Sequence, residues 1–162
     1  EEILAAFKDD GLKFEVHFIG NEEGGKPTSM HGQSEVDEDI RELCAYVKYP
    51  DTYMKYILCR NKNIRDKDWQ ACAVDGIDAK VIEECFAGDG TKLLLEDMKI
   101  AQGLGLSASP SWVANGRNKF SGVDPKTIQK NICQHNPDFK GCKAEVSGPE
   151  PRKGGKPAPS CG

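Results

Sequence analysis

The strongest constraint on how this chain can fold is a proline-led hairpin followed by a helix, within residues 106–133. Asn115-Gly116 favours a two-residue type I′ turn, because both central residues of that turn need a positive φ. The segments Trp112–Ala114 and Arg117–Phe120 would then pair as antiparallel strands on either side of the turn. A local hairpin is therefore predicted here.

The helix after the hairpin carries its own start signals. Asp124 is suited to cap the first turn, and Pro125 fits the first helical position, where a backbone N–H would lack a partner. Val123 and Ile128 occupy the two positions of a hydrophobic staple. These signals predict a helix that begins at Pro125.

Hydrophobic periodicity predicts the rest of the elements. Leu12–Phe18 alternates apolar and polar residues, as a half-buried strand does, and Asn21–Gly32 is a polar loop. Ser34 and Asp37 form a start like a capping box, and Asp78 is a second cap. Apolar residues at helical spacing predict helices at about 3–10, 34–47, 50–59, 69–73, 78–86 and 91–103. Strands separated by helices indicate an α/β architecture with a mixed sheet.

Composition excludes several classes of protein. A chain of 162 residues with 38% apolar content suits one domain. The net charge of −4, with acidic and basic residues well mixed, leaves no basic stripe for nucleic acid. No apolar run approaches the roughly 18 residues of a membrane span. Glu1-Glu2 is unlike the start of a signal peptide, so an exported protein would already have lost its leader.

The cysteine content indicates an oxidising compartment. The seven cysteines, at 44, 59, 72, 85, 133, 142 and 161, are many for a reducing one. None forms a Cys-x-x-Cys pair or has the spacing of a zinc site, so no metal is predicted. We expect a periplasmic or extracellular protein. The alternative is a cytosolic protein with buried free thiols.

The sequence alone does not fix which cysteines pair. The favoured pairs are Cys133–Cys142, Cys59–Cys72 and Cys44–Cys85. The four cysteines between 44 and 85 allow three connectivities. Cys161 could be free, could join two copies, or could pair with an upstream cysteine.

Other candidates for chemistry are weak. His17 lies at a polar strand position, which favours a solvated side chain over a catalytic base. His31 and His135 have no second ligand at metal spacing. Gly103-Leu104-Gly105 does not open a helix after a strand, so no dinucleotide site is expected, and no cofactor is predicted.

The order of elements, with Ser109-Pro110 before the hairpin and a helix after it, resembles the thioredoxin fold. The long helical segment makes the chain similar to DsbA-type thiol–disulfide oxidoreductases and, more distantly, to lysosomal thiol reductases of the γ-interferon-inducible type. The stretches that carry the resemblance are Val16–Ile19, Tyr56–Lys62 and Ser107–Phe120. The resemblance covers about residues 1–142. It implies a thioredoxin-like domain over 1–143, with a disulfide-stapled helical insertion at about 34–103. The tail at 144–162 is rich in Gly, Pro, Lys and Ser and too poor in apolar residues to pack, so we expect it to be disordered.

The resemblance also implies a binding site. Pro110 would be a cis-proline, and Ser109 would offer backbone hydrogen bonds to an extended peptide. The partners would be thiols or disulfides of proteins and peptides. The alternative is that Ser109-Pro110 only opens a strand.

The chain departs from that family at its start. Thioredoxin-like enzymes place Cys-x-x-Cys after a first strand, at the beginning of the first helix, whereas Glu1 already lies inside the expected helix. About ten to fifteen residues ahead of Glu1, or a neighbouring chain, would have to supply that strand. It would lie between Leu12–Ile19 and Trp112–Ala114, so direct pairing of these two segments would refute the hypothesis.

Two functions follow from the sequence. The first is a thiol–disulfide oxidoreductase of an oxidising compartment whose active cysteines lie upstream of residue 1. The second is a non-catalytic, disulfide-stabilised secreted domain that binds or assembles with a partner. Residues 1–162 contain no catalytic pair, so this chain alone is not expected to catalyse by a Cys-x-x-Cys mechanism.

Overall fold

A computed structural model describes residues 1–148, and the chain forms two compact units. Among the described residues, the hairpin unit consists of residues 1–14 and 110–148, and the helical unit consists of residues 15–109. The predicted helical insertion at about 34–103 lies inside the helical unit. None of the described helices is long and apolar enough to cross a membrane.

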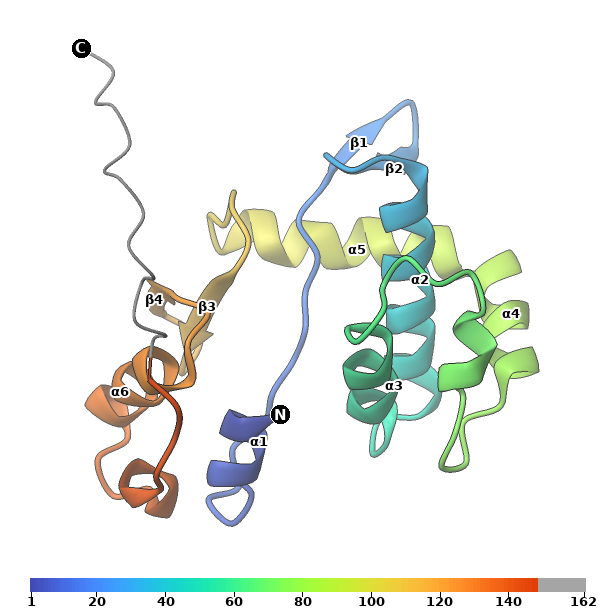
Figure 1. The fold of residues 1–162 in the computed structure, drawn as a ribbon. Helices are drawn as coiled ribbons and strands as arrows, with labels where there is room; N and C mark the ends of the chain where they lie inside the picture. The colour runs from blue at the N-terminus through green and yellow to red at the C-terminus, as the bar shows by residue number, and fades with distance from the viewer. Residues whose placement is uncertain (149–162) are drawn as a thin grey trace, which may run out of the picture. The chain divides into compact units, whose positions relative to one another are not determined.

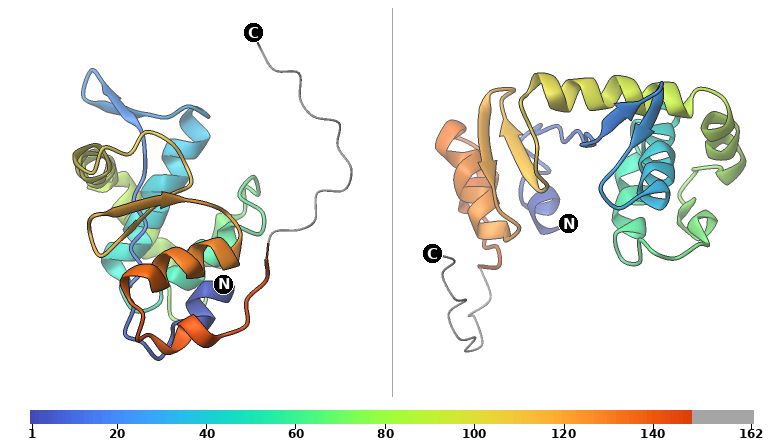
Figure 2. Two further views of the ribbon diagram at one scale, coloured as in Figure 1. Left: turned by 90° about the vertical axis from the view of Figure 1, so that its left-hand side faces the viewer. Right: turned by 90° about the horizontal axis from the view of Figure 1, so that it is seen from above.

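The hairpin unit combines short helices with one two-stranded sheet (Figures 1 and 2). Its elements are α1 (Glu2–Ala6), β3 (Ser111–Ala114), β4 (Asn118–Ser121), α6 (Pro125–His135) and the 3₁₀ turn η2 (Lys140–Lys143). α6 packs against β3 and α1. This unit has a small buried core formed by Ile3 and Phe7, in and directly after α1, and by Ile128 and Ile132 of α6.

The predicted hairpin is present, with a change at its turn. Asn115 and Gly116 both have positive φ, and the Arg117 N–H donates to the Ala114 carbonyl, as expected for a type I′ turn. Ala114 nevertheless pairs with Asn118, so Arg117 belongs to the loop and not to the predicted strand. One extra residue in the turn bulges the hairpin and shifts the start of β4 by one position.

The start of α6 confirms one predicted signal and contradicts another. The Asp124 carboxylate accepts a hydrogen bond from the Thr127 N–H at 2.8 Å, and this bond lowers the pKa of Asp124. Val123 is 79% exposed, whereas Ile128 is buried. The predicted staple between them is therefore wrong, because an exposed Val123 buries no apolar surface against the helix.

The chain after α6 folds back onto α1. The Asp10 carboxylate accepts hydrogen bonds from the backbone N–H groups of Lys140 and Gly141, at 2.6 and 2.7 Å. Glu2 accepts bonds from the N–H and the hydroxyl of Ser147. The packed chain thus extends past the predicted boundary at Ala144, because polar contacts hold a segment that is poor in apolar residues. The rest of the predicted tail, with Cys161, lies outside the described residues.

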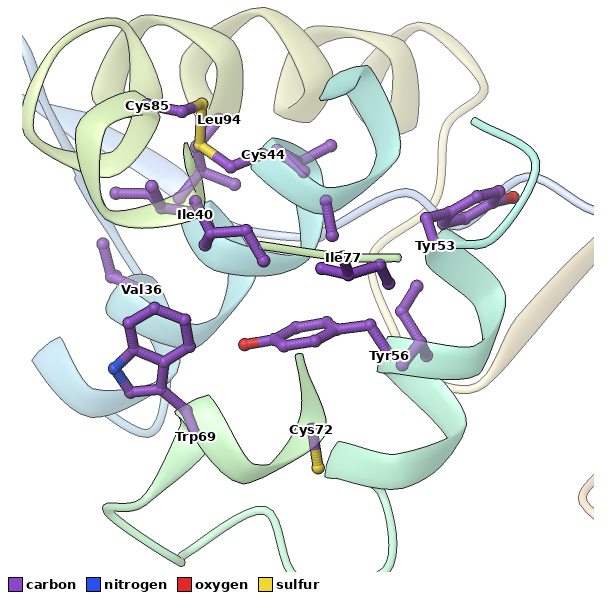
Figure 3. Packing of buried hydrophobic residues seen from close by; sticks show 14 of the residues in the cluster. Val36, Ile40, Cys44, Tyr53, Tyr56, Trp69, Cys72, Ile77, Cys85 and Leu94 are labelled. Carbon is purple, nitrogen blue, oxygen red and sulfur yellow. A yellow bond between two sulfur atoms is a disulfide. The ribbon is translucent and has the colours of Figure 1, made fainter. Parts of the chain in front are cut away.

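The helical unit is built around its longest helix. Its elements are β1 (Asn21–Glu23), β2 (Lys26–Thr28), α2 (Gln33–Lys48), α3 (Tyr53–Arg60), the 3₁₀ turn η1 (Trp69–Cys72), α4 (Ala79–Ala87) and α5 (Gly90–Gly103). α2 packs against α3, α4 and α5 (Figure 1). Its buried face meets Tyr56, Trp69 and Ile77 in one apolar cluster (Figure 3).

Helix starts in this unit differ partly from expectation. Asp78 caps α4 as predicted, by accepting a bond from the Lys80 N–H at 2.8 Å. The capping box at Ser34 is wrong, because α2 begins after Gly32 without a side-chain cap. Pro50 lies in a turn closed by a bond from the Thr52 N–H to the Tyr49 carbonyl, so α3 begins later than predicted.

The strand predictions before α2 are wrong. Residues 12–20 belong to no strand, because no neighbouring strand completes a ladder for them among the described residues. The loop predicted at Asn21–Gly32 instead contains the β1–β2 hairpin. Its turn is Gly24-Gly25, and both glycines have positive φ. A Gly-Gly pair is a recognised hairpin signal that the periodicity did not reveal, because the flanking residues are mostly polar.

Three disulfides stabilise the two units. Cys44–Cys85 joins α2 to α4, and Cys59–Cys72 joins α3 to η1, both in the helical unit. Cys133–Cys142 joins α6 to η2 in the hairpin unit. These are the pairings that the sequence favoured among its open alternatives. Three disulfides indicate an oxidising compartment.

Candidate functional site

The candidate site begins where the chain enters β3. Ser109 and Pro110 are both exposed and directly precede the strand. Among the described residues, β3 pairs with β4 alone, through the register from Ser111–Ser121 to Ala114–Asn118. A strand with a ladder on one side can accept an extended segment on the other. The site thus offers an exposed entry and a strand edge.

Side-chain contacts join the strand at this site to β4 and to the residues that follow it. Trp112 and Phe120 are cross-strand partners whose rings stack with centroids 6.1 Å apart. The indole Nε1–H of Trp112 donates to the Gly122 carbonyl at 2.9 Å. Figure 2 shows the β3–β4 hairpin beside α6, against which β3 packs. These contacts fix the backbone that would meet a ligand.

The hypothesis of a missing central strand beside β3 stays a prediction. The cis geometry of Pro110 and the backbone role of Ser109 stay predictions. The simpler interpretation, that Ser109-Pro110 only opens the strand, also stays open.

No reactive thiol is present among the described residues. All six cysteines of residues 1–148 are disulfide-bonded. The nucleophile of thiol–disulfide exchange is a thiolate, and a disulfide sulfur cannot serve as one. Any such thiol must therefore come from outside this part of the chain.

His17 is not the solvated side chain that the sequence predicts. Its Nδ1 lies 2.7 Å from the Oδ1 of Asp97, and its Nε2 lies 3.7 Å from Glu15. The other Asp97 oxygen accepts the Phe18 N–H at 2.8 Å. Asp97 is buried, so its carboxylate fastens the extended segment after Glu15 to α5. An available signal was Asp97 itself, which lies on the apolar face of a predicted helix, beside Met98.

The helical unit also contains a buried charged cluster that the sequence patterns did not predict. Arg60 of α3 donates two hydrogen bonds to Glu38 of α2, at 2.6 and 3.0 Å, and both side chains are buried. Arg60 also donates to the carbonyls of Ile64 and Asp66. The available signal was the spacing of Glu38 and Glu42, four residues apart beside the apolar face of α2.

Two carboxyl groups next to this cluster have raised pKa values. Burial, assisted by the negative charges of Glu38 and Asp39, raises the pKa of Glu42 to about 8. Burial likewise raises the pKa of Asp39 to about 8, with Glu35, Glu38 and Asp97 acting in the same direction. Both shifts favour the protonated form of these carboxyl groups.

The other histidines form no metal site. The exposed His31 pairs with Glu35 on the next turn, with Nδ1 2.9 Å from Oε1, and His135 lies exposed at the end of α6. Among residues 1–148, no group of three or more side chains is arranged to hold a metal ion.

Comparison with known proteins gives a partial match. A curated "Gamma-interferon-responsive lysosomal thiol protein" of Arabidopsis thaliana is 29% identical over 68 residues. The match covers 42% of this chain and 29% of that protein, so it spans less than a third of the relative. No family model and no solved structure matches the chain. The similarity and the three disulfides together indicate a thiol-related or disulfide-stabilised protein.

Proposed function

We propose that the parent protein is a thiol–disulfide oxidoreductase with a thioredoxin-like, DsbA-type fold, whose active cysteines lie upstream of Glu1. Ser109 and Pro110 would hold an extended peptide disulfide along β3. An upstream thiolate would then attack one sulfur of that disulfide, forming a mixed disulfide and releasing the other sulfur as a thiolate. A second upstream thiol would resolve the mixed disulfide.

The observation that carries the proposal is the entry to β3. An exposed Ser-Pro pair leads directly into a strand that, among the described residues, has a ladder on one side only, and the stacked rings of Trp112 and Phe120 join that strand to β4. Similarity to a thiol protein adds support. The six disulfide-bonded cysteines of residues 1–148 are consistent with a structural role, which leaves the chemistry to other cysteines.

Insulin reduction by the protein encoded by the whole open reading frame tests this proposal. We expect the longer protein to reduce insulin with dithiothreitol as the electron donor, faster than dithiothreitol alone. The chain of residues 1–162 should add nothing to the background rate. Replacing the upstream cysteines by serine should abolish the activity, and a longer protein without an upstream Cys-x-x-Cys or with unchanged activity after replacement would overturn the proposal.

Two substitutions at the entry to β3 then separate its backbone role from its side-chain role. Ser109→Ala keeps every backbone donor and acceptor, so the activity should stay close to that of the parent. Pro110→Ala removes the ring that fixes the backbone before β3, so KM for the peptide should rise. Equal, unchanged KM values for both variants would favour the strand-opening interpretation of this pair.

The second candidate function is a disulfide-stabilised binding or assembly domain without catalysis. The absence of any free thiol among residues 1–148 favours it. An upstream segment that forms a strand but contains no cysteine would support this function. The insulin assay would then give the background rate for the longer protein as well.

A further inference from the structure

The helical unit buries more carboxyl groups than cations. Glu38 and Glu42 of α2 are 5% and 6% exposed, and Asp97 of α5 is 7% exposed. Arg60 is the one buried cation among the described residues. Burying an ionised carboxylate without a partner is costly, so this imbalance requires a specific solution.

Hydrogen bonds account for two of these carboxylates. Glu38 takes both bonds from Arg60, and the partly buried Arg41 adds a longer one at 3.4 Å. Asp97 accepts from the Phe18 N–H and lies against His17, which in turn lies near Glu15. Neither set of bonds includes Asp39 or Glu42.

Asp39 is surrounded by negative charge. Asp39 is half-buried, and the negative charges of Glu35 and Glu38 on its own helix and of Asp97 on α5 all disfavour its ionisation. Among the other neighbours of α2, α3 supplies the buried Arg60, which is bonded to Glu38, whereas α4 buries Ile82 and Cys85 and β2 buries Pro27. Ionisation of Asp39 would therefore add a charge to a group of like charges.

Glu42 lies in a similar environment on the next turn of α2. It feels the negative charges of Glu38 and Asp39, and the positive charge of Arg60 from α3 opposes them only in part. The hydroxyl of Tyr56, also on α3, is fully buried and has no hydrogen-bond partner among the described residues. An ionised Glu42 would therefore have no hydrogen bond from a cation, because Arg60 already donates its side-chain hydrogen bonds to Glu38 and to backbone carbonyls.

We propose that the helical unit takes up protons at Asp39 and Glu42 when it folds, which makes it a pH-sensitive element that packs most stably in acidic medium. The neutral carboxyls allow α2 to pack against α3 and α5. Their ionisation weakens that packing. This property belongs to the helical unit and does not depend on the proposed oxidoreductase function.

The direction of the pH effect follows from the two end states. The ordinary pKa values of Asp39 and Glu42 are 3.8 and 4.5, and in the folded protein both are raised to about 8. Their contribution to stability is therefore complete below about pH 4 and is lost as the pH rises to about 8. Within this window, one pH unit raises the unfolding equilibrium constant by up to about tenfold for each carboxyl.

Urea unfolding with the disulfides intact tests the proposal. The chain has two tryptophans, so Trp112→Phe leaves Trp69 as the reporter of the helical unit. We expect the urea midpoint to fall steadily between about pH 5 and about pH 8. Asp39→Asn with Glu42→Gln, in the same background, should remove most of this fall. Glu83→Gln, at an exposed position of α4, is the matched control and should keep it.

Two results would overturn the proposal. One is a midpoint that stays level or rises over this pH range in the Trp112→Phe protein. The other is a double variant that keeps the parent's slope. If the double variant does not fold, carboxyl ¹³C NMR titration of the unmodified protein decides the matter. We expect Asp39 and Glu42 to titrate above about pH 7, and titration of both below about pH 5 would contradict the proposal.

Discussion

At the scale of single residues, buried polar groups distinguish this protein from a purely apolar helical unit. Glu38 and Arg60 satisfy each other, and Asp97 fastens His17 and the Phe18 N–H to α5. Each arrangement joins residues far apart in the chain. Removal of one partner leaves the other buried without compensation, and for this reason their loss should be costly.

Arg60→Ala should destabilise the helical unit by about 3 to 5 kcal/mol, because it leaves the buried Glu38 carboxylate with only the longer contact from Arg41. The measurement is urea unfolding followed by Trp69 fluorescence at neutral pH. Arg60→Met combined with Glu38→Gln is the control, and it should cost less than Arg60→Ala alone, since no charge is left unpaired. Similar losses for both proteins would contradict this assignment.

Asp97→Ala should release the extended segment after Glu15 from α5, because the Phe18 N–H loses its acceptor. We expect a loss of about 1 to 3 kcal/mol and faster amide hydrogen exchange at Phe18. Asp97→Asn keeps one side-chain oxygen for the Phe18 N–H and should protect that amide better. Unchanged exchange at Phe18 in Asp97→Ala would show that this bond does not fasten the segment.

At the scale of elements, close packing decides where short segments lie. Gly141 in η2 sits so close to α1 that a Cβ there would lie 2.5 Å from the Phe7 ring and 2.7 Å from the Ala6 carbonyl. Together with the two bonds to Asp10, this approach positions η2 on α1. The sequence predicted α6 from its cap, but the position of η2 depends on these distant contacts.

Gly141→Ala should therefore destabilise the hairpin unit by about 1 to 3 kcal/mol through overpacking. Gly103→Ala is the matched control, because Gly103 ends α5 with open space around it and has no positive φ. We expect Gly103→Ala to be neutral or to stabilise by up to about 1 kcal/mol. Thermal unfolding of both variants measures the difference, and equal effects would count against the packing argument.

At the scale of the whole molecule, disulfides supplement two small cores. The sequence separations of the bonded cysteines are 41 for Cys44–Cys85, 13 for Cys59–Cys72 and 9 for Cys133–Cys142. In the chain-entropy model, closing these three loops stabilises the folded protein by about 4, about 3 and about 2.5 kcal/mol, respectively. The helical unit thus relies most on the bond between α2 and α4.

Replacing both cysteines of a disulfide by alanine should destabilise the protein in the same order as the calculated loop-closure contributions. Loss of Cys44–Cys85 should lower the thermal midpoint most, and loss of Cys133–Cys142 least. Differential scanning calorimetry of the three double variants under non-reducing conditions measures the effect. An inverted order would show that native packing around the sulfurs outweighs loop closure.

The sequence by itself determined the helix caps, turns and apolar helix faces, because each of these depends on residues close together in the chain. The caps at Asp78 and Asp124, the turn at Asn115-Gly116 and the apolar faces of the helices depend on neighbours within a few residues. The tertiary structure alone decided what depends on distant partners. Residues 12–20 form no strand because a strand requires a ladder, and His17 is only partly exposed because Asp97 lies against it. The raised pKa values of Asp39 and Glu42 likewise follow from desolvation and from the charge of Glu38, and desolvation is a property that no short stretch of sequence encodes.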